Sequence, residues 1–184
     1  MGKKEQIIVK AMELFVDQGF ENTPTSQISK ESNVATGTLF HHFKTKEDLI
    51  NEIYIFIKKD LLRDIAETIG KDDSVKNVLN KFWSFYIKWA FENKTEYAYI
   101  LKFNNSGYVT EKTIDVVIQE FSFYEDVVNK GINENIFRSI PSKLIWKIYG
   151  NIGESIIDYI YESGNYDKDL ADEGFEMFWN AVKK

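Results

Sequence analysis

The residues best suited to chemistry lie between Thr36 and Lys46, in the sequence TGTLFHHFKTK. At about 100° per residue, one face of a helix over this stretch collects small polar side chains, with His42 on its flank. The face consists of Gly37, Thr38, His41 and Thr45. It is nearly flat and has no charge before Lys44. Such a surface allows close approach to the major groove and offers hydrogen-bonding groups to base edges, so the pattern predicts a helix that reads DNA.

Two neighbouring elements would position that face. Leu39, Phe40 and Phe43 fall within one arc of about 100°, which predicts that they form the buried side of the same helix. Another short helix precedes it, with Pro24 in its first turn and Asn33 in the turn that follows. The sequence therefore predicts a helix-turn-helix.

The same residues argue against catalysis. His41 and His42 are the only histidines, and adjacent helix positions diverge by about 100°, so they cannot share a metal ion. The chain has no cysteine, no serine–histidine pairing and no glycine-rich phosphate loop. We expect no enzyme activity, no metal site and no cofactor.

A longer run of spaced residues surrounds the motif: Gly19-Phe20, Thr23, Ile28, Val34, Gly37 to Phe43, and Lys46-Glu47-Asp48-Leu49. This run resembles the N-terminal DNA-binding domain of the TetR family of transcriptional regulators, over about residues 4–57 without a gap. The resemblance implies a homodimer that binds a double-stranded DNA operator, a repressor released by a small ligand. The DNA-binding residues that it implies are Thr25, Ser26, Thr36, Gly37, Thr38, Phe40, His41, His42, Lys44 and Lys46.

The chain departs from the family pattern at three positions. Asn33 stands where the family often has glycine, and Ala35 where it often has a serine or threonine cap. Phe40 replaces a tyrosine whose hydroxyl commonly touches phosphate, so Phe40 cannot make that contact. Lys46 matches a position that usually does touch phosphate.

Composition and charge set wider limits. The 184 residues are 43% hydrophobic and 15% aromatic, which is ample for a core. No apolar run reaches the roughly 20 residues needed to span a membrane, and MGKKEQ is not a signal peptide, so we expect a cytoplasmic protein. Residues 1–47 hold six lysines and six acidic residues, so residues 48–184 carry the whole net charge of −6.

Helical periodicity throughout, with only two prolines, predicts an all-α fold of about nine helices. We expect a three-helix DNA-binding domain at 1–46 and a connecting helix at 47–70. A helical ligand-binding and dimerisation domain follows at 71–184, with one long helix from Thr110 to about Gly131.

Aromatic residues are concentrated in the middle of the chain, and this concentration has two possible interpretations. They could fill a solid core, or they could line a pocket, because buried tyrosine and tryptophan need partners for their polar groups. The family resemblance implies a cavity for a small hydrophobic or aromatic effector. Glu92, Glu96, Glu120 and Glu154 are either surface residues or groups that face a cationic ligand. The candidate ligand-binding residues are Trp83, Tyr86, Trp89, Tyr97, Phe103, Phe121, Tyr124, Trp146 and Tyr149.

The last two predicted helices are unusually apolar and contain glycines in mid-helix, where each costs about 1 kcal/mol relative to alanine. They could pack within one subunit, or they could form the four-helix dimer interface that the resemblance implies. The candidate interface residues are Gly150, Gly153, Ile156, Ile160, Phe175, Phe178 and Trp179.

A second function stays open. Phe40 and the neutral charge of residues 1–47 also fit a small-molecule-binding helical dimer whose DNA binding is weak or lost. A salt-dependent DNA shift separates the two hypotheses.

Overall fold

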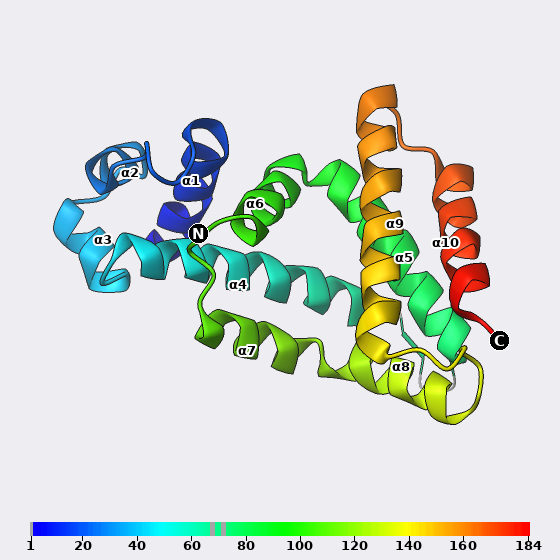
Figure 1. Cartoon of the computed structure of the whole chain (residues 1–184). Coiled ribbons are helices and arrows are strands. Elements are labelled where there is room, and N and C mark those ends of the chain that lie inside the picture. The colour runs from blue at the N-terminus through cyan, green and yellow to red at the C-terminus, as the bar shows by residue number, and fades with distance from the viewer. Residues whose placement is uncertain (1, 67–68, 71–72) are drawn as a thin grey trace. The chain divides into compact units, whose positions relative to one another are not determined.

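The computed structural model describes residues 2–66, 69–70 and 73–184 (Figure 1), and in that part of the chain the regular structure is helical. An isolated antiparallel β-bridge joins Phe137 to Lys183. The helices are α1 (Lys3–Gln18), α2 (Thr25–Glu31), α3 (Thr36–His42), α4 (Lys46–Ala66), α5 (Val75–Glu92), α6 (Lys94–Asn104), α7 (Glu111–Glu120), α8 (Ser122–Asn133), α9 (Ser142–Ser163) and α10 (Lys168–Val182). The predicted all-α fold class is confirmed, with ten helices in these residues where about nine were expected.

The additional helix comes from the segment between Thr110 and Gly131, for which one continuous helix was predicted. That prediction was wrong, because the chain leaves the helix at Phe121 and begins α8 directly afterwards. The two helices bury very different amounts of side chain: α7 buries Thr113 alone, whereas α8 buries Tyr124 and several neighbours. The apolar pattern runs on through Phe121, so periodicity could not reveal the break.

The chain forms two compact units. The first comprises Met1–Asp60 and Asn93–Ile118, and the second comprises Leu61–Glu92 and Gln119–Lys184. These units do not follow the predicted ranges 1–46, 47–70 and 71–184, because α6 and most of α7 pack with the N-terminal helices. As a division by function, the predicted ranges remain a prediction.

The N-terminal helices of the first unit share an apolar core. From α1, Ile7, Ala11 and Phe15 are fully buried, as their helical spacing predicts. Gly19 ends α1 with φ +83°, a backbone conformation that glycine adopts without strain, and Phe20 then packs against Phe15 with ring centroids 5.3 Å apart. This core fixes the positions of α2 and α3.

Helix α6 covers the same core, which sequence analysis did not predict. Tyr99 is fully buried and its hydroxyl donates to the carbonyl oxygen of Ile50 in α4 at 2.8 Å. Its ring meets Phe20 edge-on at 5.5 Å. One turn further, Phe103 stacks on Tyr54 of α4 at 4.2 Å. The N-terminal helices are therefore part of a larger helical unit, with aromatic contacts from α6 holding both α1 and α4.

A buried polar cluster, the Asn51 cluster, joins α4 to the start of α7. The side-chain amide of Asn51 donates to the carbonyl oxygens of Glu47 and Tyr108, both at 2.9 Å. Its oxygen accepts from the hydroxyls of Thr113 at 2.6 Å and Thr110 at 3.4 Å. Asn51 and Thr113 are only 8% and 2% exposed, so their polar groups have little access to water. The hydrogen bonds within the cluster satisfy these groups instead.

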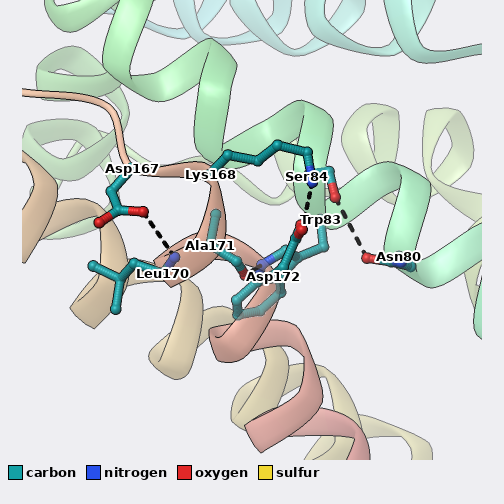
Figure 2. Close-up of polar contacts among 8 residues, drawn as sticks. All are labelled: Asn80, Trp83, Ser84, Asp167, Lys168, Leu170, Ala171 and Asp172. Carbon is teal, nitrogen blue, oxygen red and sulfur yellow. Dashed lines mark hydrogen bonds and ion pairs between the residues drawn. The ribbon is translucent and has the colours of Figure 1, made fainter.

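In the second unit, α9 and α10 pack against α5 around Trp83, and α8 packs against α5 and α9. The indole N–H of Trp83 donates to the carbonyl oxygen of Ala171 at 2.7 Å, and Figure 2 shows the indole lying against α10 at that residue. A Cβ atom added to Gly174 would lie 2.7 Å from Ile156 and 3.1 Å from Trp83, so only glycine allows α10 to approach α5 and α9 this closely.

The start and end of α10 are both anchored. Asp167 caps its N-terminus by accepting from the Leu170 backbone N–H at 3.0 Å (Figure 2). After α10, the backbone N–H of Lys184 donates to the Ile136 carbonyl and that of Arg138 donates to the Val182 carbonyl. The C-terminal residues are thus held against the connector that precedes α9.

Candidate nucleic-acid interface and effector site

Helix α3 is held by its apolar side. Leu39 is fully buried and Phe43, directly after the helix, is 3% exposed, which confirms two of the three predicted anchors. The third was wrong, because Phe40 is 40% exposed. One residue on from Leu39, Phe40 is turned about 100° away, and a helix of seven residues is too short to be covered on its flanks.

The opposite side of α3 is open. Gly37 and His41 are exposed, and Thr38 is half-buried. A Cβ atom at Gly37 would meet nothing within 4 Å, so the surface there is unobstructed. The rings of His41 and His42 lie edge to face with centroids 5.4 Å apart. This face has the small size, the hydrogen-bonding groups and the lack of carboxylates that major-groove binding requires.

The turn that orients α3 has the predicted geometry, and the helix after it begins without a side-chain cap. Asn33 adopts φ +53°, the left-handed conformation expected of it. Ala35 is the N-cap residue and no side chain caps α3, so its first backbone N–H groups are available to other acceptors. Before the turn, Thr25 is half-buried and Ser26 exposed at the start of α2.

The two candidate lysines differ in their surroundings. Lys44 is exposed. Lys46 is half-buried at the start of α4, with its ammonium 3.5 Å from the Glu21 carbonyl oxygen and 5.9 Å above the Phe15 ring. Thr45 and Asp48 cap this helix reciprocally, each accepting from the other's backbone N–H at 3.0 Å. The cap fixes Lys46 at the edge of the helix-turn-helix.

Sequence analysis did not identify the residues that anchor the loop between α1 and α2 to the rest of the first unit. Tyr108, in the loop before α7, donates its hydroxyl to the Glu21 carboxylate at 2.6 Å, and its ring packs on Phe20. Asn51 holds the Tyr108 carbonyl from the other side. The sequence contained one sign of this buried contact, because Asn51 is a polar residue between the apolar positions Ile50 and Ile53 of α4.

Seven of the nine candidate ligand-binding residues lie in the second unit and form one connected aromatic cluster. The aromatic cluster consists of Trp83, Tyr86, Trp89, Phe121, Tyr124, Trp146 and Tyr149, joined through Phe82. Phe82, which was not predicted, lies 4.6 Å from Tyr124 and 6.0 Å from Tyr86 between ring centroids. The other two candidates, Tyr97 and Phe103, belong to the first unit.

The polar groups of the aromatic cluster are unequally satisfied. The Tyr149 hydroxyl donates to the Leu79 carbonyl at 3.0 Å, and the Trp146 indole N–H donates to the Glu125 carboxylate at 2.6 Å. Tyr124 is 4% exposed, yet its hydroxyl makes no hydrogen bond with the described residues. Burial raises the pKa of Tyr124 to about 12, and burial together with the nearby Tyr124 and Tyr86 raises the pKa of Tyr149. Both phenol groups are therefore neutral near pH 7.

Glu125 was not among the glutamates named from sequence. Of those four, Glu154 is exposed on α9 and Glu92 is exposed beside Lys88, with 3.7 Å between the charged atoms. Glu125 follows Tyr124 in α8 and could have been found from its place in an aromatic run. Within the described residues, no group of three or more metal-binding side chains comes together.

The candidate dimer residues are mostly interior to the single chain. Ile160 and Phe178 are fully buried, and Phe175, Ile156 and Trp179 are at most 8% exposed. Gly153 faces the Trp83 ring, so all six buried candidates pack within one subunit, the alternative left open above. Gly150 is exposed, with open space beside its Cα.

A different face of α9 and α10 remains exposed and partly apolar. On α9, Leu144 is 43% and Tyr159 is 60% exposed, and on α10 Met177 is 51% exposed. Leu144 and Tyr159 are 15 positions apart, so they lie within about 60° of each other around the helix. Ile148 and Ile152 lie between them and are half-buried. This stripe is the surface that a partner helix could cover.

The chain is similar to known bacterial regulators. Residues 7–53 match the family described as Bacterial regulatory proteins, tetR family. The HTH-type transcriptional regulator QacR of Staphylococcus aureus is 26% identical over the full length of both chains. In three dimensions, a TetR-family transcription regulator from Marinobacter aquaeolei superposes with a TM-score of 0.90 at 16% identity, over 99% of this chain and 96% of that one.

The transcriptional regulator FadR from Bacillus subtilis, solved in complex with stearoyl-CoA, superposes with a TM-score of 0.79 at 18% identity, covering 95% of this chain and 96% of that one. At this identity the likeness establishes the fold. Within the described residues, no helix of the present chain is both long and apolar enough to cross a membrane.

Proposed function

The chain belongs to the TetR family of bacterial regulators, and we propose that it is a sequence-specific DNA-binding transcriptional regulator, a repressor released by a small hydrophobic or aromatic effector. The observation that carries this proposal is the outward face of α3. It is exposed, free of side-chain obstruction at Gly37 and free of carboxylates, and it belongs to the segment that matches the family.

In this proposal residues 1–46 bind DNA, and Thr25, Ser26, Thr36 and Lys44 flank the reading face. Lys46 contacts phosphate, for which it must turn from the Glu21 carbonyl and the Phe15 ring. The exchange is favourable, since a charge-assisted bond to phosphate is stronger than one to a carbonyl at 3.5 Å. The neutral charge of residues 1–47 makes non-specific binding weak, so a useful affinity needs two copies.

We assign dimerisation to the exposed stripe of α9 and α10. A second copy would cover Leu144, Tyr159 and Met177, which are large apolar side chains exposed on these two helices. Two reading helices can then meet successive major-groove faces, about 34–36 Å apart.

We assign effector binding to the aromatic cluster of the second unit. Its rings offer flat apolar surfaces, and the Tyr124 hydroxyl makes no hydrogen bond within the described residues, so it can bond to a ligand. The Glu125 carboxylate is engaged by Trp146. A hydrophobic or aromatic effector that carries one hydrogen-bonding group matches these features. FadR with its bound stearoyl-CoA indicates that this fold accommodates a ligand with a long apolar chain.

The decisive experiment begins with selection of an operator from random double-stranded DNA, followed by fluorescence anisotropy at several salt concentrations. We expect one enriched sequence with a two-fold pattern and an affinity that falls as salt rises. Lys46→Ala should weaken binding to all sequences alike and reduce the salt slope by about one. Lys130→Ala, an exposed lysine of α8, is the matched control and should change neither quantity.

Effector release is read in the same assay. An acyl-CoA and a panel of aromatic compounds are added to the protein–operator complex, and an effector lowers the anisotropy. Tyr124→Phe should weaken that effector about three- to tenfold, the value of one hydrogen bond, whereas Tyr159→Phe on the exposed side of α9 should not. Absence of any enriched DNA sequence, with effector binding intact, would favour the alternative of a small-molecule-binding dimer without DNA binding.

A further inference from the structure

Phe40 is an exposed phenyl ring on a surface that is otherwise small and polar. It is 40% exposed, and it makes no ring contact with another aromatic residue in the part of the chain that the structure describes. Leu39 and Phe43 already anchor α3 to the core at 0% and 3% exposure. The fold therefore has no need of a third large apolar side chain on a helix of seven residues.

The ring stands at the edge of the reading face. At about 100° per residue, Phe40 lies roughly 40° from Thr36 and 60° from Gly37 around the helix axis. Thr36 is short, and Gly37 has no side chain and open space around it. Nothing on α3 therefore prevents the ring from reaching the DNA surface on that flank.

The chemistry of the ring restricts what it can recognise there. A phenyl group has no hydrogen-bond donor or acceptor, so it cannot bind a phosphate or a polar base edge through a hydrogen bond. The one apolar group that B-DNA presents in the major groove is the 5-methyl group of thymine, and apolar side chains, phenylalanine among them, contact it. That methyl lies beside the sugar–phosphate chain of its own strand, where the flank of a recognition helix passes.

We propose that Phe40 packs against the 5-methyl group of a thymine and thereby makes the protein prefer thymine at one position of each operator half-site. The inference rests on the proposed function, since it requires that α3 enter the major groove. It goes further in assigning a specificity-determining contact to one residue and one chemical group of the base.

The test uses the full-length protein and the operator obtained by selection. Each thymine of a half-site is replaced in turn by deoxyuridine, which removes the methyl group and leaves base pairing intact. For the wild type, we expect the affinity to fall about three- to fivefold at one position, the effect of burying one methyl group, and little elsewhere. With Phe40→Ala, the same replacement at that position should have no effect.

Phe40→Leu is the second variant, because it keeps an apolar side chain and should keep part of the preference for the methyl group. Both variants should fold as the wild type does, since the side chain is exposed, and circular dichroism checks this. The inference is overturned if no deoxyuridine replacement weakens the wild type, or if Phe40→Ala remains as sensitive to the methyl group. A uniform loss of affinity for all DNA would instead show a backbone contact and would also overturn it.

Failure of the proposed function looks different. In that case the wild type would bind no DNA sequence preferentially, and Phe40 would have no base to contact. A protein that binds its operator tightly, but does so equally with thymine and with deoxyuridine at every position, leaves the proposed function intact and removes only the assignment of Phe40.

Discussion

The Asn51 cluster allows a specific prediction about what stabilises the first unit. Asn51→Leu keeps the approximate volume of the side chain and removes all of its hydrogen bonds. Glu47 and Thr113 each retain a partner, because the Glu47 carbonyl lies within the helix and the Thr113 hydroxyl is 2.9 Å from that of Thr110. The Tyr108 carbonyl loses its 2.9 Å bond to the amide.

The expected loss of stability in Asn51→Leu follows from the number of hydrogen bonds that are removed. Two net hydrogen bonds, to Tyr108 and from Thr113, contribute about 1 kcal/mol each, and the stranded Tyr108 carbonyl adds up to about 1 kcal/mol. The free energy of unfolding should therefore fall by about 2–3 kcal/mol, a large fraction of the 5–15 kcal/mol typical of a domain. Thr113→Val alone should cost about 1 kcal/mol, because it removes one bond to Asn51 and leaves the Thr110 contact of Asn51 in place.

The assay is urea unfolding followed by circular dichroism at 222 nm. The four tryptophans, at positions 83, 89, 146 and 179, all lie in the second unit, so their fluorescence follows that unit separately. Asn22→Leu is the matched control, since Asn22 is exposed and bonds only within its own turn to the Gln18 carbonyl, and it should cost less than about 0.5 kcal/mol.

The double variant Asn51→Leu with Thr113→Val decides whether the two side chains act together. If they do, its cost is smaller than the sum of the single costs by about 1 kcal/mol. The reasoning is refuted if Asn51→Leu costs no more than Asn22→Leu, or if the two substitutions add fully. Either result would mean that water replaces Asn51 in the cluster.

Three further predictions concern other parts of the chain. Ser32 has a buried hydroxyl without a partner in the described residues, so Ser32→Ala should raise the unfolding free energy by about 0.5–1 kcal/mol in the same urea assay, whereas Ser29→Ala, which removes a 2.9 Å bond to a backbone carbonyl, should lower it. Tyr159→Asp on the exposed stripe should give folded monomers in sedimentation velocity, and a dimer of this variant would contradict the assigned face. Trp179→Glu changes a residue that is only 8% exposed, so this variant should instead lose its helical circular dichroism signal. The pKa of Tyr124 is about 12 in the folded state and about 10 in the unfolded state, so the unfolded state loses its proton first as pH rises. The free energy of unfolding should therefore fall between about pH 10 and pH 12. Tyr124→Phe should make this fall shallower, and an unchanged pH profile would refute the prediction.

The sequence by itself determined the helix-turn-helix. Its elements are short and depend on local chemistry: the left-handed turn at Asn33, the cap of Thr45 on α4, and the spacing that buries Leu39. Each of these features depends on residues within about four positions of one another. For the same reason the resemblance to a known family could be recognised in this stretch and the all-α fold class predicted.

Positions set by distant contacts could not be predicted. The break at Phe121 leaves the apolar pattern unchanged, and the exposure of Phe40 depends on how far the neighbouring helices reach around α3. Phe175 and Phe178 could have faced a partner or their own subunit, because helical periodicity identifies an apolar face but does not say which surface covers it.

The extent of the N-terminal unit was likewise decided only in three dimensions. Tyr99 and Tyr108 lie about 50 and 90 positions after the segments that they contact, Ile50 and Glu21, and nothing local marks them as partners. A buried hydrogen bond forms wherever the fold brings a donor and an acceptor together, whatever their separation in the chain. The sequence therefore specified the outward face of α3, whereas the tertiary structure determined which helices hold that face in place.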